Sequence, residues 1–149
     1  MKLKYYGIYN EQYDELSASN CPIVNLISIE ITKDIFDNID MYMYKDGEII
    51  LDPDYEEKQK QKERDRINHL KMTKRVCALM LQQLGISYTE LKEAIASSEQ
   101  AQLEWDLCIE LERGNPLINQ IGTTFGLTSK QIDRMFQYAN GEVNTLEVE

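Results

Sequence analysis

The side chains best suited to catalysis at neutral pH are few and widely separated in this sequence. His69 is the only histidine, and it lies in a polar stretch eight residues before Cys77. Cys77 lies within the apolar run 76–81, where a buried and unreactive thiol is the ordinary outcome. Cys108 falls on the apolar face of an expected helix and receives the same interpretation. We therefore predict no catalytic residue and no enzymatic activity.

Acidic residues at helical spacing raise the question of a metal site. Asp34, Asp37 and Asp40 follow one another every three residues. Hard cations take oxygen ligands from several directions, usually from a glycine-containing loop, and the sequence has no loop of that pattern. The seven glycines are isolated, so no phosphate-binding glycine motif is present. The three cysteines form no CxxC pair and indicate neither zinc nor a disulfide framework. We predict no metal and no cofactor.

The charge of the 149-residue chain is unevenly distributed, although its sum is −10. Residues 1–53 carry four basic and ten acidic side chains, and residues 76–149 carry four and eleven. Residues 54–75 carry eight basic and five acidic side chains, a net of +3. The two acidic ends disfavour nucleic acid and anionic membranes as partners, because like charges repel. The apolar runs are also too short to span a membrane, and unpaired cysteines suit a cytoplasm.

Hydrophobic patterning predicts an α+β protein with a small β-rich N-terminal domain over residues 1–53. Residues 10–20 are polar and are expected to form a loop. Asp46 and Gly47 supply the two positive-φ residues of a type I′ turn, which predicts a hairpin. The expected elements are strands at 3–9, 23–31, 41–45 and 48–51, and a helix at 33–40.

The remainder of the chain is expected to be helical. Residues 54–72 are polar on every side of a helix and predict a charged linker helix. Residues 142–149 are expected to form a flexible tail. A repeat relates residues 84–91 to residues 125–132, and each copy combines a glycine helix end with a Ser or Thr capping box. It predicts two helix-turn-helix units in an all-α helical-hairpin domain over residues 73–141. The expected helices are 73–84, 87–96, 98–113, 116–125 and 128–139.

Three stretches of the sequence resemble small proteins encoded in the tail modules of phages and prophages of Gram-positive bacteria. The first combines residues 30–32, 44–53 and 55–57, and is also similar to the N-terminal part of tail-fibre assembly chaperones. The others are residues 113–122 and 126–136. The resemblance implies a tail fibre or baseplate component, or a tail-fibre assembly factor. It implies a place in the cytoplasm of a bacterial host or in the virion tail, and no catalytic residues.

The sequence therefore favours a non-enzymatic protein that binds a phage tail fibre or baseplate protein, and a homo-oligomer remains an alternative. Tyrosine is favoured at protein interfaces, and a small sheet leaves edges open to a partner strand. The candidate contact residues lie in the N-terminal sheet and in the segment 113–121, which begins at the end of the helix expected at 98–113. They are Tyr5, Tyr9, Tyr42, Tyr44, Arg113, Asn115, Pro116 and Asn119.

Two other function classes remain open at this point. An acidic phage inhibitor of a host defence or nucleic-acid enzyme would use the net charge of −10 as a phosphate mimic. Such a mimic needs its acids in a stripe, and the basic segment 54–75 interrupts them. A helix-turn-helix regulator would read DNA with residues 129–136, which include Lys130, Gln131 and Arg134. The net charge of −7 over residues 76–149 opposes that use.

Overall fold

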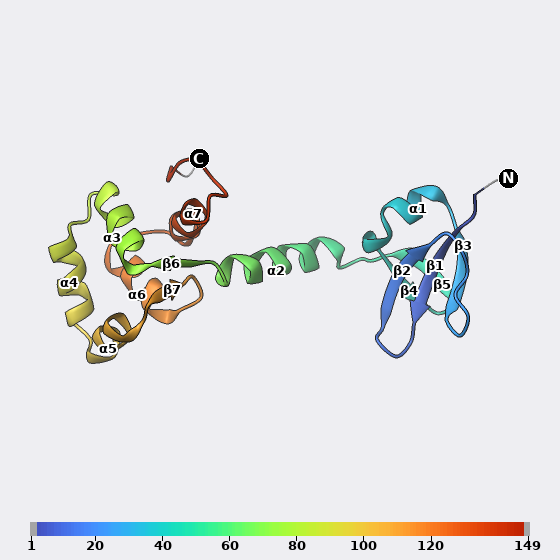
Figure 1. Cartoon of the computed structure of the whole chain (residues 1–149), viewed down its shortest axis with the longest axis horizontal. Coiled ribbons are helices and arrows are strands. Elements are labelled where there is room, and N and C mark those ends of the chain that lie inside the picture. Colours follow the sequence, from blue (N-terminus) through green and yellow to red (C-terminus); the bar gives the residue numbers. More distant parts are fainter. Residues whose placement is uncertain (1–2, 148–149) are drawn as a thin grey trace. The chain divides into compact units, whose positions relative to one another are not determined.

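The computed structural model describes residues 3–147 and divides the chain into two compact units. One unit extends to Lys60 and the other starts at Gln61. Helices and small antiparallel sheets are both present, which confirms the predicted α+β class. Figure 1 labels the elements of each unit. Within residues 3–147, no helix has both the length and the apolar character that crossing a membrane requires.

The N-terminal unit is built on a three-stranded antiparallel sheet in the order β2-β1-β3. Its strands are β1 (Tyr5–Asn10), β2 (Glu15–Ser19) and β3 (Ile27–Ile31). The predicted loop at 10–20 was wrong, because it contains β2. This strand is polar in composition, but Leu16 pairs with Tyr9 and brings its apolar side chain onto the face that carries the β3 isoleucines. Pairing with β1 therefore determines this strand, rather than local composition.

A short helix and a hairpin complete the N-terminal unit. They comprise α1 (Lys33–Asp37), the 3-10 helix η1 (Ile39–Met41), β4 (Tyr42–Lys45) and β5 (Glu48–Leu51). Thr32 caps α1 as expected, since its hydroxyl accepts a hydrogen bond from the Ile35 amide. The hairpin is confirmed, with φ values of 51° at Asp46 and 93° at Gly47. The helix predicted at 33–40 ends early because its chain passes into η1.

The hairpin and α1 contact one face of the sheet at alternate residues of β1. Tyr5 contacts Phe36 of α1, and Gly7 faces Ile49 of β5 so closely that a Cβ would overlap the Ile49 Cδ1 atom. Gly7 and Ile8 are the only buried residues among those described in residues 3–60. The N-terminal unit therefore has a thin core for its size.

The helix α2 (Tyr55–Asn68) contains the division between the two units. None of its residues is buried, in agreement with the predicted polar helix. At its start, Tyr55 donates a hydrogen bond to Asp40 at 3.1 Å, and Lys58 pairs with Asp52 at 2.7 Å. The predicted linker at 54–72 extends past the observed helix, because the chain becomes strand β6 (Lys71–Thr73).

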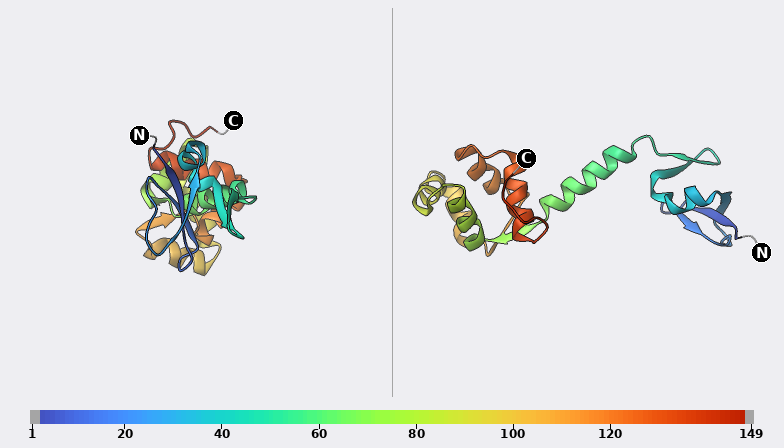
Figure 2. Two further views of the ribbon diagram at one scale, coloured as in Figure 1. Left: turned by 90° about the vertical axis from the view of Figure 1, so that its right-hand side faces the viewer. Right: turned by 90° about the horizontal axis from the view of Figure 1, so that it is seen from above.

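The C-terminal unit contains five helices and one small sheet among its described residues. In chain order after β6 these are α3 (Lys74–Gln83), α4 (Tyr88–Ala96), α5 (Glu99–Leu107), β7 (Glu110–Glu112), α6 (Pro116–Thr124) and α7 (Ser129–Ala139). They are coloured from light green to red in Figure 1 and appear from two other sides in Figure 2.

The prediction of an all-α C-terminal domain was wrong, because β6 pairs with β7. The helix expected at 98–113 ends at Leu107, and Leu111 instead lies opposite Met72 in this sheet. Two further bonds extend the pairing, from the Arg113 amide to the Leu70 carbonyl and from the Gly114 amide to the Asn68 carbonyl, each at 2.9 Å. The sheet thus joins the end of α2 to the chain that enters α6.

The two repeated turns have the predicted structure. Gly85 and Gly126 adopt φ values of 87° and 66°, which residues with a Cβ disfavour. The following amides bond back over five residues, from Ile86 to Leu81 and from Leu127 to Gly122, as in a Schellman motif. Complete capping boxes then start α4 and α7. These turns bring α3, α4, α6 and α7 around one core, which includes Trp105, Leu111 and Phe136.

Candidate protein-binding surfaces

The tyrosines proposed as contact residues pack largely within the N-terminal unit. Tyr9 of β1 stacks on Tyr44 of β4 with ring centroids 4.1 Å apart, and its hydroxyl donates to Asp14 at 2.8 Å. The centroids of Tyr5 and Phe36 lie 4.9 Å apart. Tyr42 is also only partly exposed. These rings hold α1 and the hairpin on the sheet, and only part of each is left for a partner.

Arg113 is turned into the C-terminal unit, with 5% of its surface exposed. Its Nε atom donates to Asp133 at 2.6 Å, Nη1 to Asn119 at 3.0 Å, and Nη2 to Ser129 at 2.8 Å. One guanidinium therefore connects the chain after β7 to both α6 and α7. We assign Arg113 a structural role, because each of its three guanidinium nitrogens already donates a hydrogen bond within the unit.

The other three candidates in this segment lie at the start of α6. Asn115 is its N-cap, accepting a hydrogen bond from the Leu117 amide at 2.8 Å, and Pro116 follows in the first turn. Asn119 and Pro116 are exposed, but the Asn119 side-chain oxygen accepts from Arg113. The structure brings Arg113 and Asn119 together, while the four tyrosines belong to the other unit.

An apolar patch that sequence reasoning missed lies at one end of the N-terminal sheet. Tyr13, in the turn after β1, is 68% exposed, and Val24, just before β3, is 84% exposed. Both lie at the same end of the sheet, because Tyr9 pairs with Leu16 and Ile27 on its two sides. Ile23 is exposed beside Val24, and we name Tyr13, Ile23 and Val24 the loop-end patch. The strand expected at 23–31 begins only at Ile27, so Val24 lies in the preceding loop and is exposed.

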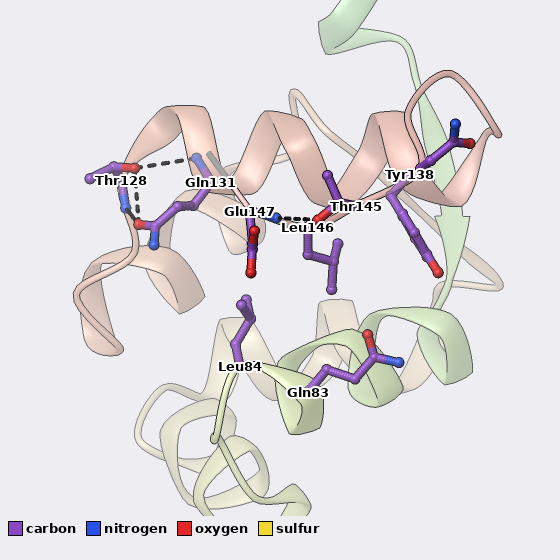
Figure 3. Close-up of a pocket in the computed structure, with 9 residues that line it drawn as sticks. Gln83, Leu84, Thr128, Gln131, Tyr138, Thr145, Leu146 and Glu147 are labelled. Atoms are coloured by element: carbon purple, nitrogen blue, oxygen red, sulfur yellow. Dashed lines mark hydrogen bonds between the residues drawn. The ribbon is translucent and has the colours of Figure 1, made fainter. Parts of the chain in front are cut away.

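A long open pocket of about 1020 Å³ lies in the C-terminal unit between α3, α7 and the residues after α7. Figure 3 shows Leu146 pointing toward α3 in this pocket, and Leu146 packs against the core. The Arg134 Nε atom donates to the Thr145 carbonyl at 3.0 Å. Residues 142–147 of the predicted flexible tail therefore make defined contacts, whereas its last two residues lie outside the described part.

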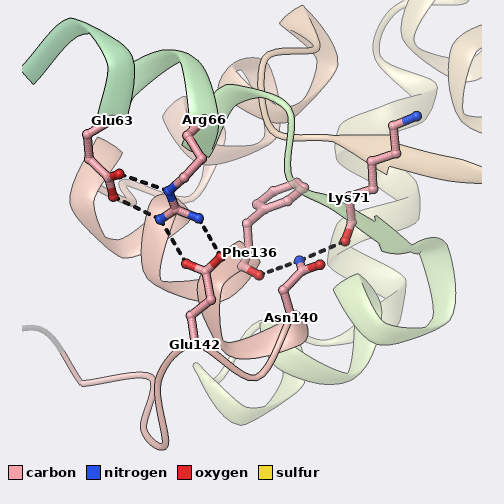
Figure 4. A network of polar contacts seen from close by, with 6 residues as sticks. All are labelled: Glu63, Arg66, Lys71, Phe136, Asn140 and Glu142. Atoms are coloured by element: carbon pink, nitrogen blue, oxygen red, sulfur yellow. Dashed lines mark hydrogen bonds and ion pairs between the residues drawn. The ribbon is translucent and has the colours of Figure 1, made fainter. Parts of the chain in front are cut away.

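A polar network attaches the same C-terminal stretch to the end of α2 (Figure 4). Arg66 binds Glu63 through Nε and Nη2, each at 2.8 Å, and Glu142 through Nη1 and Nη2. The Arg66 guanidinium lowers the pKa of the Glu63 carboxyl below its usual value by hydrogen bonding to the charged form. The Asn140 side chain donates to the Lys71 carbonyl at 3.0 Å. Arg66 is therefore a structural residue, although it belongs to the basic segment.

The side chains considered first for chemistry are not arranged as a site. His69 is exposed, and its Nδ1 lies 2.7 Å from the Asp65 carbonyl. Cys77 is buried, and burial raises the pKa of its thiol to about 12, with a smaller contribution from Cys108. Within the described residues, no group of three or more His, Cys, Asp or Glu side chains is placed to hold a metal ion.

The buried thiol makes a direct chemical prediction. In the native chain, iodoacetamide will alkylate the exposed Cys21 readily, and Cys77 at least about a thousandfold more slowly than in the unfolded chain, since each pKa unit removes nine-tenths of the reactive thiolate. Peptide mass spectrometry after timed labelling at about pH 8 measures both rates. Labelling in concentrated urea is the control, where the two cysteines should react alike. Equal native rates at Cys21 and Cys77 would contradict this burial.

Comparison of the chain with models of protein families, with curated protein sequences and with solved structures found no match. The fold and the surfaces therefore define the class as an α+β protein of two compact units, with exposed apolar residues at one end of its N-terminal sheet.

Proposed function

We propose that this chain is a non-enzymatic tail-module protein of a phage or prophage, which acts by contacting a tail fibre or baseplate protein. The observation that carries the proposal is the loop-end patch. A unit that buries only Gly7 and Ile8 among its described residues, yet exposes Tyr13 and Val24 at the same end of its sheet, has apolar surface that a partner protein can cover. The resemblance to tail-module proteins supplies the class of partner, and it is carried by residues 30–32, 44–53, 55–57, 113–122 and 126–136.

The open edge of the N-terminal sheet at β3 supports the same proposal. In the order β2-β1-β3, β2 and β3 are edge strands, and β2 has contacts with β4 and η1. The outer side of β3 therefore offers the more open row of backbone donors and acceptors for strand addition. Val24 lies three residues before β3, so a partner strand along this edge would also reach the loop-end patch.

The regulator alternative is less favoured by the positions of the α7 side chains. Gln131 closes the capping box with Thr128, and Arg134 donates to the Thr145 carbonyl. Asp133 binds Arg113. Of the residues proposed to read DNA, Lys130 alone is exposed without such an internal contact in the described chain. A protein partner therefore suits these surfaces better than phosphates do.

The protein composition of purified tail particles tests the proposed tail-module function. We expect quantitative mass spectrometry to detect the chain in purified tail particles, or a tagged copy to retain the fibre or baseplate protein encoded beside its gene. A tagged, unrelated acidic protein of similar size is the control for charge-driven retention. Absence of the chain from both the particles and the fibre or baseplate complexes would overturn the proposal.

A further inference from the structure

A second surface, in the C-terminal unit, combines basic and aromatic side chains around Trp105. A groove of about 530 Å³ is lined by residues of α3, by Tyr88 at the start of α4 and by Trp105 of α5. A smaller hollow of about 140 Å³ shares Tyr88 and Trp105 with it and adds Lys92. We name the two together the Trp105 groove. Its apolar lining includes Leu79 and Tyr88, both of which remain about half exposed.

Three cations line this groove, and none of them forms an ion pair with a carboxylate within residues 3–147. Lys74 donates to the Trp105 carbonyl at 2.8 Å and lies 6.0 Å from the centroid of its ring. Lys92 lies over Tyr88 at 5.8 Å, and Arg75 is exposed beside Lys74. By contrast, Arg66 and Arg113 both bind carboxylates. The groove therefore has positive charge that the protein leaves largely uncompensated.

The surroundings make this local charge distinctive. Residues 76–149 carry four basic and eleven acidic side chains, and Lys92 is one of those four. Asp106 is the one acidic residue that lines the groove, and its carbonyl, at 3.4 Å, is a further acceptor for Lys74. Lys74 and Arg75 end the basic segment 54–75, Lys92 belongs to the acidic residues 76–149, and the fold places all three beside a single carboxylate. Such an arrangement attracts an anionic partner to one place and repels it elsewhere.

We propose that the Trp105 groove binds an acidic peptide segment that carries a large apolar side chain. The apolar residue would cover Leu79 and Tyr88, while carboxylates on either side would reach Arg75 and Lys92. In peptide-binding grooves, a buried apolar side chain commonly supplies affinity, while charged residues beside it supply specificity. The Trp105 groove does not depend on the loop-end patch, which lies in the other unit.

A peptide fits these observations better than a nucleic acid. Single-stranded nucleic acid also uses aromatic rings and cations, but its affinity depends on neutralising many phosphates. This groove offers three cations, and the acidic side chains of residues 76–149 would repel a continuing phosphate backbone. A short peptide does not extend beyond the groove, so these acidic side chains do not repel it.

Fluorescence anisotropy with the full chain tests the proposal. The probe is a labelled peptide of about ten residues in which glutamates flank a Leu-Phe pair. The double variant Arg75→Glu/Lys92→Glu should weaken its binding at least about tenfold, because both charges are reversed at exposed positions. The matched control Lys130→Glu reverses an exposed cation of α7 and should leave the affinity unchanged.

Specificity controls complete the experiment. A peptide with lysines in place of the glutamates, and a labelled oligothymidine of similar length, should bind at least about tenfold more weakly than the acidic peptide. Failure of the acidic peptide to bind would overturn the proposal. So would equal loss of affinity in the Lys130→Glu control, or tighter binding of the oligothymidine, which would assign the groove to nucleic acid.

Discussion

Replacing Arg113 by Met will destabilise the C-terminal unit by about 3 kcal/mol, although Met retains most of the side-chain volume. The guanidinium is buried and binds Asp133, Asn119 and Ser129. Its loss would leave the Asp133 carboxylate without its cation and two further acceptors without their donor. We place the cost at the lower end of the range for a broken buried pair, since the Asp133 side chain is 30% exposed.

The free energy of unfolding can be measured for this unit alone. Trp105 is the only tryptophan of the chain and lies in the core of the C-terminal unit, so its fluorescence during urea denaturation reports on that unit. Lys130→Met is the matched control, because it removes an exposed cation of α7 and should change stability by less than about 0.5 kcal/mol. Equal stability of the Arg113→Met and Lys130→Met variants would contradict the structural role of Arg113.

Two leucines four residues apart will lose very different amounts of stability on truncation. Leu111→Ala should cost about 3 kcal/mol, because Leu111 is fully buried in β7 opposite Met72 and its removal leaves a cavity. Leu107→Ala should cost less than about 0.5 kcal/mol, because Leu107 is 74% exposed at the end of α5. A single helix over residues 98–113 would place both on one apolar face and bury them alike.

The same Trp105 fluorescence measures both variants. Similar losses of stability for Leu107→Ala and Leu111→Ala would restore the continuous helix and remove the pairing of β6 with β7. Hydrogen exchange at the Arg113 and Gly114 amides is an independent measure, since they donate to the carbonyls of Leu70 and Asn68 in the structure. Their protection should be lost in Leu111→Ala before the protection of α7 amides is lost.

The local features of the fold were predictable from the sequence, because they depend on neighbouring residues. The hairpin at Asp46 and Gly47, and the turns at Gly85 and Gly126, follow from positive φ values and from capping within four residues. These features operate at short range, and a single sequence contains them in full.

Elements that depend on distant partners were missed. The strands β6 and β7 have three residues each, and residues 74–109 separate them, so no local pattern marks them as strands. β2 is polar and becomes a strand because it pairs with β1. Arg113 was selected as a contact residue, but its partners Asp133 and Ser129 belong to another helix and are not deducible from the segment itself.

The candidate surfaces show the same division. The tyrosines were identified correctly as concentrated in the N-terminal part, but Tyr9 and Tyr44 stack on each other once the hairpin folds onto the sheet. The exposure of a side chain is a property of the folded unit, and in this unit it indicates Tyr13 and Val24 as the candidate contact residues instead. The Trp105 groove likewise requires α3, α4 and α5 to be in place before its cations come together.

The affinity of the chain for the proposed fibre or baseplate partner most directly tests the proposal that the loop-end patch binds that protein. Calorimetry should show that the double variant Tyr13→Ser/Val24→Ser binds at least about tenfold more weakly than the wild type. The reason is that a few anchor residues contribute most of the binding free energy of such an interface. Leu51→Ser, which alters an exposed apolar residue of β5, should bind like the wild type. Undiminished affinity of the double variant would contradict the account.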